Sequence, residues 1–248
     1  MKLLGLSLIL LFSGLSIQAQ ACERNHDECF SVRWRFQFQQ SVAALENPGQ
    51  VNEVLSQLVS IAETHRFHPQ SIINGYEAVA KSFGSSNTAQ IKAALRKIAQ
   101  HAQDSKDFVD LASFTVAVER RENSPTQSVE AVDLVGHYWH LENAGEAYLQ
   151  ALNGLGSQHT DHVRSAFRKM VDYSDAGDLL EMAKVLSRVE RRENAPSQSV
   201  EGLVWILKGA RVCGSIADAA YVYLELLSSI GSGNTAEVQK NYRTVMGL

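Results

Sequence analysis

Apolar residues recur at helical spacing along most of the chain. Three segments carry apolar side chains at positions i, i+4, i+7 and i+8, namely Ile91, Leu95, Ile98 and Ala99, then Val163, Phe167, Met170 and Val171, and then Val238, Tyr242, Val245 and Met246. On an α-helix this spacing gathers the four side chains on one face. The pattern therefore predicts amphipathic helices that bury one face in a shared core.

Two sequence markers repeat in the same order along the chain. The segment Val118–Glu130 recurs as Val189–Glu201, which is an offset of 71 residues (118 to 189). A degraded upstream copy of this marker is assigned to Glu63–Ser71. The second marker occurs three times, as Gly84–Ile91, Gly156–Val163 and Gly231–Val238. Two independent markers in one cyclic order indicate an internal repeat.

Helix boundary signals accompany both markers. Ser124, Pro125 and Gln127 suit the N-cap, the first and the third helical positions, and Asn234 with Glu237 forms a second capping-box pattern. The Gly-Ser stretches before the second marker are typical of helix ends. A full unit is thus expected to hold four helices in about seventy residues. Only residues 69–83 separate the two markers of the first unit, so one helix is expected to be missing there.

The fold predicted from these patterns is all-α. We expect an array of about nine to eleven stacked antiparallel helices, with a continuous core between layers. Residues 22–248 form one helical-repeat domain in this prediction, with an N-terminal cap at 22–50, a short unit at 51–103 and full units at 104–174 and 175–248. The helix-pair length is close to that of tetratricopeptide repeats, but the Trp, Leu-Gly and Tyr signature of that family is absent.

The first 21 residues are predicted to be a secretory signal peptide. Lys2 supplies a positive charge, residues 3–17 are mostly apolar, and Ala19 and Ala21 place small residues where a signal peptidase reads them. The alternatives are a membrane anchor and lipidation of Cys22. Cleavage after Ala21 implies a secreted or periplasmic protein with no integral membrane segment in the mature chain.

The cysteines fit an oxidising compartment. Cys22 and Cys29 flank a short polar loop and are predicted to form a disulfide. Free thiols, or a metal site that includes His26, are the alternatives. Cys213 is expected to be a buried small hydrophobic residue.

Composition and charge exclude several functional classes. The chain is 45% hydrophobic and 20% charged, which is a globular composition. Its 23 Lys and Arg against 27 Asp and Glu give a net charge of -4, so we expect no nucleic-acid partner. No P-loop, dinucleotide fingerprint, Gly-x-Ser-x-Gly or His-Glu-x-x-His motif is present, so no cofactor and no catalytic residue are predicted.

Two groups of residues are candidates for binding. Arg120 and Arg121 recur as Arg191 and Arg192, near predicted helix ends. They form either an exposed, ion-paired helix end or a ridge that grips a carboxylate or phosphate. The pair Tyr138 and Trp139 has no aromatic counterpart in the next unit, and either fills a local gap in the core or lines a groove for a peptide or sugar.

Histidine pairs are candidate metal ligands. Three pairs stand at i, i+3 spacing, namely His65 with His68, His137 with His140, and His159 with His162. The repeat replaces His137 and His140 by Lys208 and Arg211, as expected for a solvated helix face. The sequence therefore predicts no metal site.

The function predicted from the sequence is that of an exported, non-catalytic interaction or scaffold protein. Helical arrays of this kind often bind a protein or peptide partner, and we expect binding on the concave face of the array, although a fold does not fix a function. The alternative is an exported hydrolase that acts on cell-envelope polymers. Convergence of His137, His140, Glu142 and Glu146 in one deep pocket would favour the enzyme, and a broad shallow face would favour the binding protein.

Overall fold

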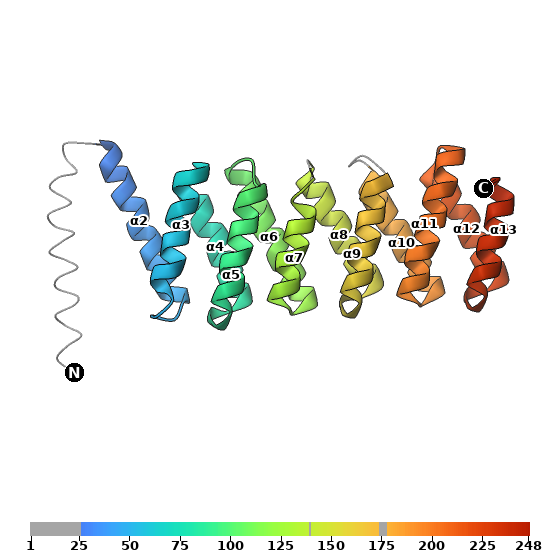
Figure 1. Ribbon diagram of the computed structural model, residues 1–248, viewed down its shortest axis with the longest axis horizontal. Helices are drawn as coiled ribbons and strands as arrows, with labels where there is room; N and C mark the ends of the chain where they lie inside the picture. Colours follow the sequence, from blue (N-terminus) through green and yellow to red (C-terminus); the bar gives the residue numbers. More distant parts are fainter. Residues whose placement is uncertain (1–25, 139, 174–177) are drawn as a thin grey trace.

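A computed structural model describes residues 26–138, 140–173 and 178–248 (Figure 1). These residues form twelve α-helices and no strand, so the predicted all-α fold is confirmed, with one helix more than the upper expected number. In chain order the helices are α2 His26–Leu45, α3 Val51–His65, α4 Pro69–Phe83, α5 Thr88–His101, α6 Ser105–Glu122, α7 Pro125–Val135, α8 Leu141–Leu155, α9 Thr160–Tyr173, α10 Leu179–Glu193, α11 Pro196–Cys213, α12 Ile216–Ile230 and α13 Thr235–Met246.

The helices stack in two rows along the long axis of the molecule. Figure 1 shows the odd-numbered helices in front and the even-numbered helices behind. Consecutive helices are antiparallel, so the helices within one row run parallel to each other. Each helix packs against its chain neighbours in the other row and against the next helix of its own row. This is the predicted array of stacked helical hairpins.

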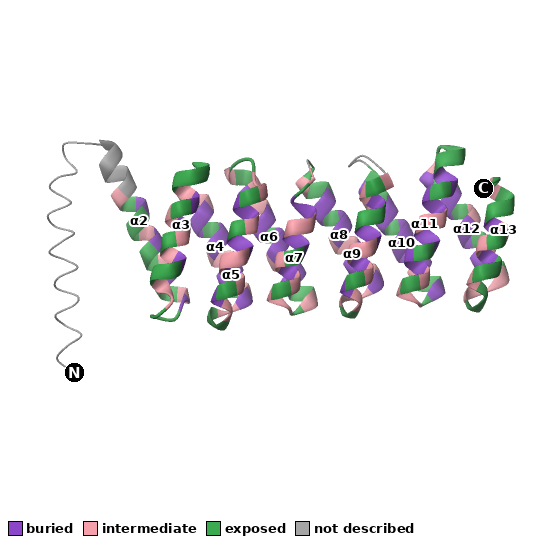
Figure 2. Cartoon of the chain, in the orientation of Figure 1, coloured by how far each residue is buried: buried purple, intermediate pink, exposed green. Residues whose placement is uncertain are grey.

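The core lies between the two rows, as the apolar spacing predicts. Figure 2 shows buried residues along the inner faces of both rows and exposed residues outside. The aligned residues Leu95, Phe167 and Tyr242 are all fully buried in this core. Val245 is an exception, because it is 62% exposed on the last helix, which has no further neighbour to cover it.

The helices of the even row do not pack equally closely. Gly154 on α8 lies against Ser187 on α10, where an added Cβ would come 2.4 Å from Ser187 Oγ and 3.0 Å from its Cα. Gly75 on α4 lies against Phe108 on α6 in the same way. The pairs α4/α6 and α8/α10 are therefore in close contact, while α6 and α8 lie further apart.

The two capping boxes that the sequence predicts are not formed. Ser124 precedes α7, but its side chain makes no cap hydrogen bond. The Gln127 amide oxygen lies 3.3 Å from the Thr160 hydroxyl instead. Asn234 also makes no cap hydrogen bond at α13, and its amide donates back to the Ile230 carbonyl. Gln127 thus contacts another helix, and Asn234 bonds to the end of the preceding helix. Neither takes part in the capping box that the sequence predicts.

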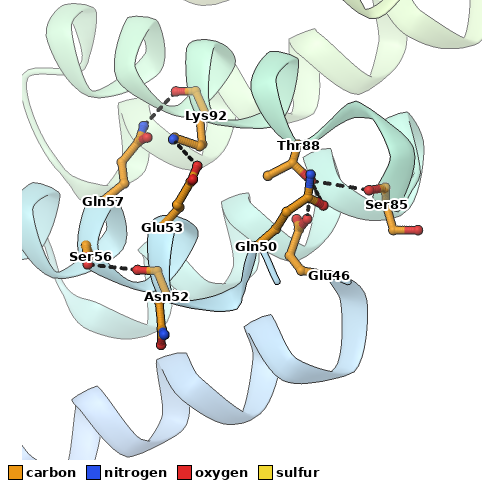
Figure 3. Close-up of polar contacts among 9 residues, drawn as sticks. All are labelled: Glu46, Gln50, Asn52, Glu53, Ser56, Gln57, Ser85, Thr88 and Lys92. Carbon is orange, nitrogen blue, oxygen red and sulfur yellow. Dashed lines mark hydrogen bonds and ion pairs between the residues drawn. The ribbon is translucent and has the colours of Figure 1, made fainter. Parts of the chain in front are cut away.

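A buried polar cluster marks each unit and corrects the position of the upstream copy. In the first unit the Thr88 hydroxyl lies 2.6 Å from Glu46 Oε2 (Figure 3). The Tyr76 hydroxyl donates to Glu46 Oε1 over 3.3 Å. The equivalent contacts elsewhere are Thr160 to Glu122 and Thr235 to Glu193. The segment Glu46–Gln50, and not Glu63–Ser71, therefore takes the place of the later Glu-Asn-x-Pro-x-Gln segments, with one residue fewer between the Asn and the Gln.

This register supplies the helix that seemed to be missing. From Val51 to Glu122 the first unit holds α3, α4, α5 and α6, which take the places of α7, α8, α9 and α10. The segment Glu63–Ser71 resembles the marker because its local turn is similar. Arg66 has a left-handed backbone at φ 56°, like Asn123 at φ 50°, and Pro69 begins a helix.

Several predictions concern residues outside the described part of the chain. The leader, Cys22 and Trp139 are not described, nor is the side chain of Cys29, so signal cleavage and the disulfide stay predictions. Among the described helices, none is long and apolar enough to cross a membrane. Cys213 is exposed at the end of α11, which corrects the expectation that it is buried.

Candidate binding surface

A groove on the outer face of the even row separates α6 from α8. It encloses about 420 Å³. Its apolar lining comes from Leu111 and Phe114 on α6 and from Leu141, Gly145 and Leu149 on α8. A Cβ at Gly145 would lie 3.2 Å from the Phe114 ring, so the glycine keeps the floor of the groove clear. The groove exists because α6 and α8 pack less closely than the adjacent pairs α4/α6 and α8/α10 of this row.

The rim of the groove carries an excess of negative charge. Lys106 pairs with Asp110 on α6 at 2.5 Å, and the hydrogen bond and charge of Asp110 raise the pKa of Lys106. Glu142 and Glu146 on α8 also line the groove. Neither forms an ion pair within the described part of the chain, although the charge of Glu142 also raises the pKa of Lys106. The groove thus offers an apolar floor beside two unpaired carboxylates.

The four residues chosen to discriminate an enzyme from a binding protein do not meet in one pocket. Glu142 and Glu146 line the α6/α8 groove, which His137 and His140 do not. His137 lies next to His101, with ring centroids 4.5 Å apart. His140 is exposed immediately before α8. The arrangement lacks the convergence that the hydrolase alternative requires.

The arginine pairs lie at the C-terminal ends of α6 and α10. Arg121 Nε donates to Asn153 Oδ1 at 2.7 Å, and Arg120 is exposed. Within the described residues, neither arginine forms an ion pair. The adjacent Glu119 and Glu122 turn toward the interior, with Glu119 accepting a hydrogen bond from the Ser128 hydroxyl. The expected surface ion pairs between these residues are therefore absent from the described structure.

The ridge on α10 is more strongly basic than the repeat alone suggested. Arg188, Arg191 and Arg192 line a recess of about 370 Å³. Lys184 is exposed on the same helix, one turn before Arg188. Comparison of the repeated residues missed Lys184 and Arg188 because Ser113 and Ala117 occupy these places on α6. The signal in the sequence was the i, i+4, i+7, i+8 spacing of the four cations.

Tyr138 packs toward the core. Its ring meets Phe167 edge-on with centroids 5.6 Å apart, and desolvation by burial raises the pKa of its hydroxyl. Trp139 is outside the described residues. The contact of Tyr138 with the core agrees with a side chain that fills a local gap there, and not with one that lines a groove.

The histidine pairs take different positions. His68 precedes α4, where its Nδ1 accepts a hydrogen bond from the Gln70 amide at 3.3 Å. His159 and His162 lie with ring centroids 6.0 Å apart. The structure adds a neighbour that the sequence did not reveal, because His101 at the end of α5 joins His137 across two helices.

Two of the repeated buried glutamates are destabilised as anions. Desolvation by burial raises the pKa of Glu122 and that of Glu193. In the second unit Arg164 partly offsets this effect for Glu122, whereas nearby Glu190 and Glu201 raise the pKa of Glu193 further. Glu193 therefore sits among acidic neighbours, with the Thr235 hydroxyl as a hydrogen-bond partner.

Replacing Glu193 by glutamine is expected to stabilise the protein at neutral pH. A carboxyl whose folded pKa lies above its unfolded value contributes stability below the unfolded value, and this is lost as the pH rises through the folded pKa. Glutamine has the same shape and does not ionise. Denaturant unfolding at about pH 7 should give a larger free energy of unfolding for Glu193→Gln than for the wild type. At about pH 4 the difference between the two proteins should be smaller.

The matched control is Glu225→Gln on the exposed face of α12. This change is expected to shift the free energy of unfolding by less than about 0.5 kcal/mol at either pH. A Glu193→Gln protein that is less stable than the wild type at neutral pH would show that the charged carboxylate stabilises the cluster.

Comparison with known proteins identifies no relative. No protein-family model matches the chain, and neither a curated protein nor a solved structure is significantly similar to it.

Proposed function

We propose that this protein is an exported, non-catalytic scaffold that binds a peptide segment of a protein partner in the α6/α8 groove. The partner segment carries an apolar side chain flanked by lysine or arginine. The apolar side chain fills the groove, and the basic side chains face Glu142 and Glu146. The predicted leader at residues 1–21 supports export to the periplasm or to the outside of the cell.

The apolar groove with two unpaired carboxylates carries this proposal. Grooves between helices commonly hold an apolar helix face or an extended peptide, with charges at the rim setting the choice of partner. The floor residues Phe114 and Leu149 supply contact area, while the acidic rim disfavours an acidic segment. The separation of His137 from Glu142 and Glu146 makes the hydrolase alternative the weaker of the two.

Binding of two synthetic peptides tests the proposal. One peptide has leucines along one helix face with flanking lysines, and the other replaces every lysine by glutamate. In fluorescence anisotropy the basic peptide should bind, and the acidic peptide should bind at least tenfold more weakly. The variant Glu142→Lys/Glu146→Lys turns two attractions of about 0.5–1 kcal/mol into repulsions, so it should weaken the basic peptide by about tenfold or more.

A control with the same change of net charge separates the groove from general electrostatics. Glu181→Lys/Glu225→Lys alters exposed residues on α10 and α12 and should leave binding close to the wild-type value. Leu149→Arg should abolish binding by filling the groove. Equal weakening by both double variants, or no binding of the basic peptide to the wild type, would refute the proposal.

A further inference from the structure

Three potential metal ligands meet where α5 and α7 end. His101 is the last residue of α5, Asp133 lies in the last turn of α7, and His137 follows that helix. His101 Nε2 lies 3.0 Å from Asp133 Oδ1. One ligand atom from each residue can be chosen so that all three lie within 4.8 Å of one another. Zinc ligands at 2.0–2.1 Å from the metal are themselves about 3.3 Å apart, so only a small closure is needed.

A local contact prepares the His137 imidazole ring to bind a metal. His137 Nδ1 lies 2.5 Å from the Asp133 carbonyl oxygen, which only accepts hydrogen bonds. The proton of a neutral ring is therefore on Nδ1, and the Nε2 lone pair is available. A backbone carbonyl that accepts the second ring N–H in this way is the usual support for a metal-bound histidine.

Gly136 provides the space for the His101 ring. A Cβ at this position would lie 2.5 Å from His101 Cγ and 2.6 Å from Cδ2. The backbone of Gly136 has φ -63°, which any residue adopts, so conformation does not require glycine here. Glycine is required because the His101 imidazole occupies the space that a side chain at position 136 would need.

One carboxylate oxygen of Asp133 already has two partners. Lys97 Nζ and His101 Nε2 both contact Oδ1. The other carboxylate oxygen, Oδ2, is the one that a metal would take.

The cluster occurs in one unit and is not a repeated structural feature. The equivalent residues of the next unit are Tyr173, Val204, Leu207 and Lys208. None of these is a carboxylate or an imidazole, and Tyr173 packs instead under the Arg211 guanidinium at 5.2 Å. Residues with a purely structural role recur from unit to unit in this array. The three ligands do not recur, as expected for a single metal site.

We propose that His101, Asp133 and His137 bind one divalent transition-metal ion, with Zn²⁺ as the preferred ion. Two imidazole nitrogens and one carboxylate oxygen are a ligand set that zinc accepts, with water at the remaining position. The ion links the ends of α5 and α7. This proposal replaces the expectation of no metal, which considered only histidine pairs on single helices, and it does not rest on the proposed function.

Titration with ZnCl₂ alone tests the site. The mature protein is used without an affinity tag, with Cys22, Cys29 and Cys213 replaced by serine so that no thiolate competes. Isothermal titration should give one zinc per chain. A saturating concentration, about 100 times the dissociation constant, should raise the melting temperature by roughly 5–10 °C relative to protein in EDTA.

Matched substitutions assign the ligands. His101→Gln and His137→Gln should each weaken zinc binding at least tenfold and remove the thermal shift, and Gly136→Ala should weaken it by displacing the His101 ring. The control His162→Gln, from the neighbouring His159–His162 pair, should bind like the parent. Melting in EDTA verifies that each variant is folded. Absence of stoichiometric binding in the parent, or unchanged binding in a folded His101→Gln or His137→Gln variant, would overturn the proposal.

Discussion

Replacing Phe167 by alanine is expected to lower the free energy of unfolding by about 3–5 kcal/mol. The side chain is fully buried and packs edge-on against both Tyr138 and Tyr148, with centroids 5.6 Å from each. Truncation loses the transfer free energy of the ring and leaves a cavity that rigid helices fill only in part. Urea unfolding followed by circular dichroism measures the change.

Two further substitutions provide a comparison for the stability loss expected of Phe167→Ala. Tyr242→Ala removes an equivalent buried ring from α13, but that helix has a neighbour on one side only, so the loss should be smaller than for Phe167→Ala. Arg120→Ala removes an exposed side chain without an ion pair and should cost less than about 1 kcal/mol. A larger loss for Tyr242→Ala than for Phe167→Ala would mean that coupling between neighbouring units does not govern stability.

The helices and their inward faces were predictable from the sequence. The recurrence of Leu95, Phe167 and Tyr242 at one place in successive units identified the core, because apolar spacing records which face of a helix avoids water. Where this reasoning failed, at Val245, the residue has helical spacing but is exposed, because no described helix covers that part of α13. Spacing shows which face is apolar, but not whether another helix covers it.

The turns were predicted less well, since local signals there compete with tertiary contacts. Ser124 and Gln127 have the sequence of a capping box, yet Gln127 reaches Thr160 on α9. The upstream copy was misplaced for a similar reason. Pro69 preserves the local turn, whereas Glu46 preserves the buried contact with Thr88, and only the structure shows that the contact defines the unit.

Neither candidate site followed from the sequence. The α6/α8 groove depends on how far apart two helices pack, and Gly145 and Phe114 show no pattern that reveals this distance. The cluster at Asp133 depends on the approach of α5 to α7, which brings His101 to residues more than thirty positions away. By contrast, the two further cations of the α10 ridge, Lys184 and Arg188, could be predicted from helical spacing alone.

Replacing Gly154 by valine is expected to destabilise the protein by about 3 kcal/mol, at the upper end of the usual cost of overpacking. The new Cβ would lie 2.4 Å from Ser187 Oγ and 3.0 Å from Ser187 Cα, which belongs to the backbone of α10 and cannot rotate away. The hydroxyl is also fixed, because it donates to the Ala183 carbonyl and accepts from the Gln150 amide. The substitution must therefore separate α8 from α10, and urea unfolding measures the cost.

A double-mutant cycle distinguishes this clash from a general effect of losing glycine. Gly154→Ala removes a helix-destabilising glycine, which alone would gain about 1 kcal/mol, so a net loss identifies the contact with Ser187. Adding Ser187→Gly removes the two side-chain atoms nearest the new Cβ and should recover part of that loss, giving a coupling energy above about 0.5 kcal/mol. Gly49→Ala, where an added Cβ meets nothing within 4 Å, should change stability little. If the Gly154→Ala and Ser187→Gly effects simply add, the close approach of α8 and α10 does not limit the residue at position 154.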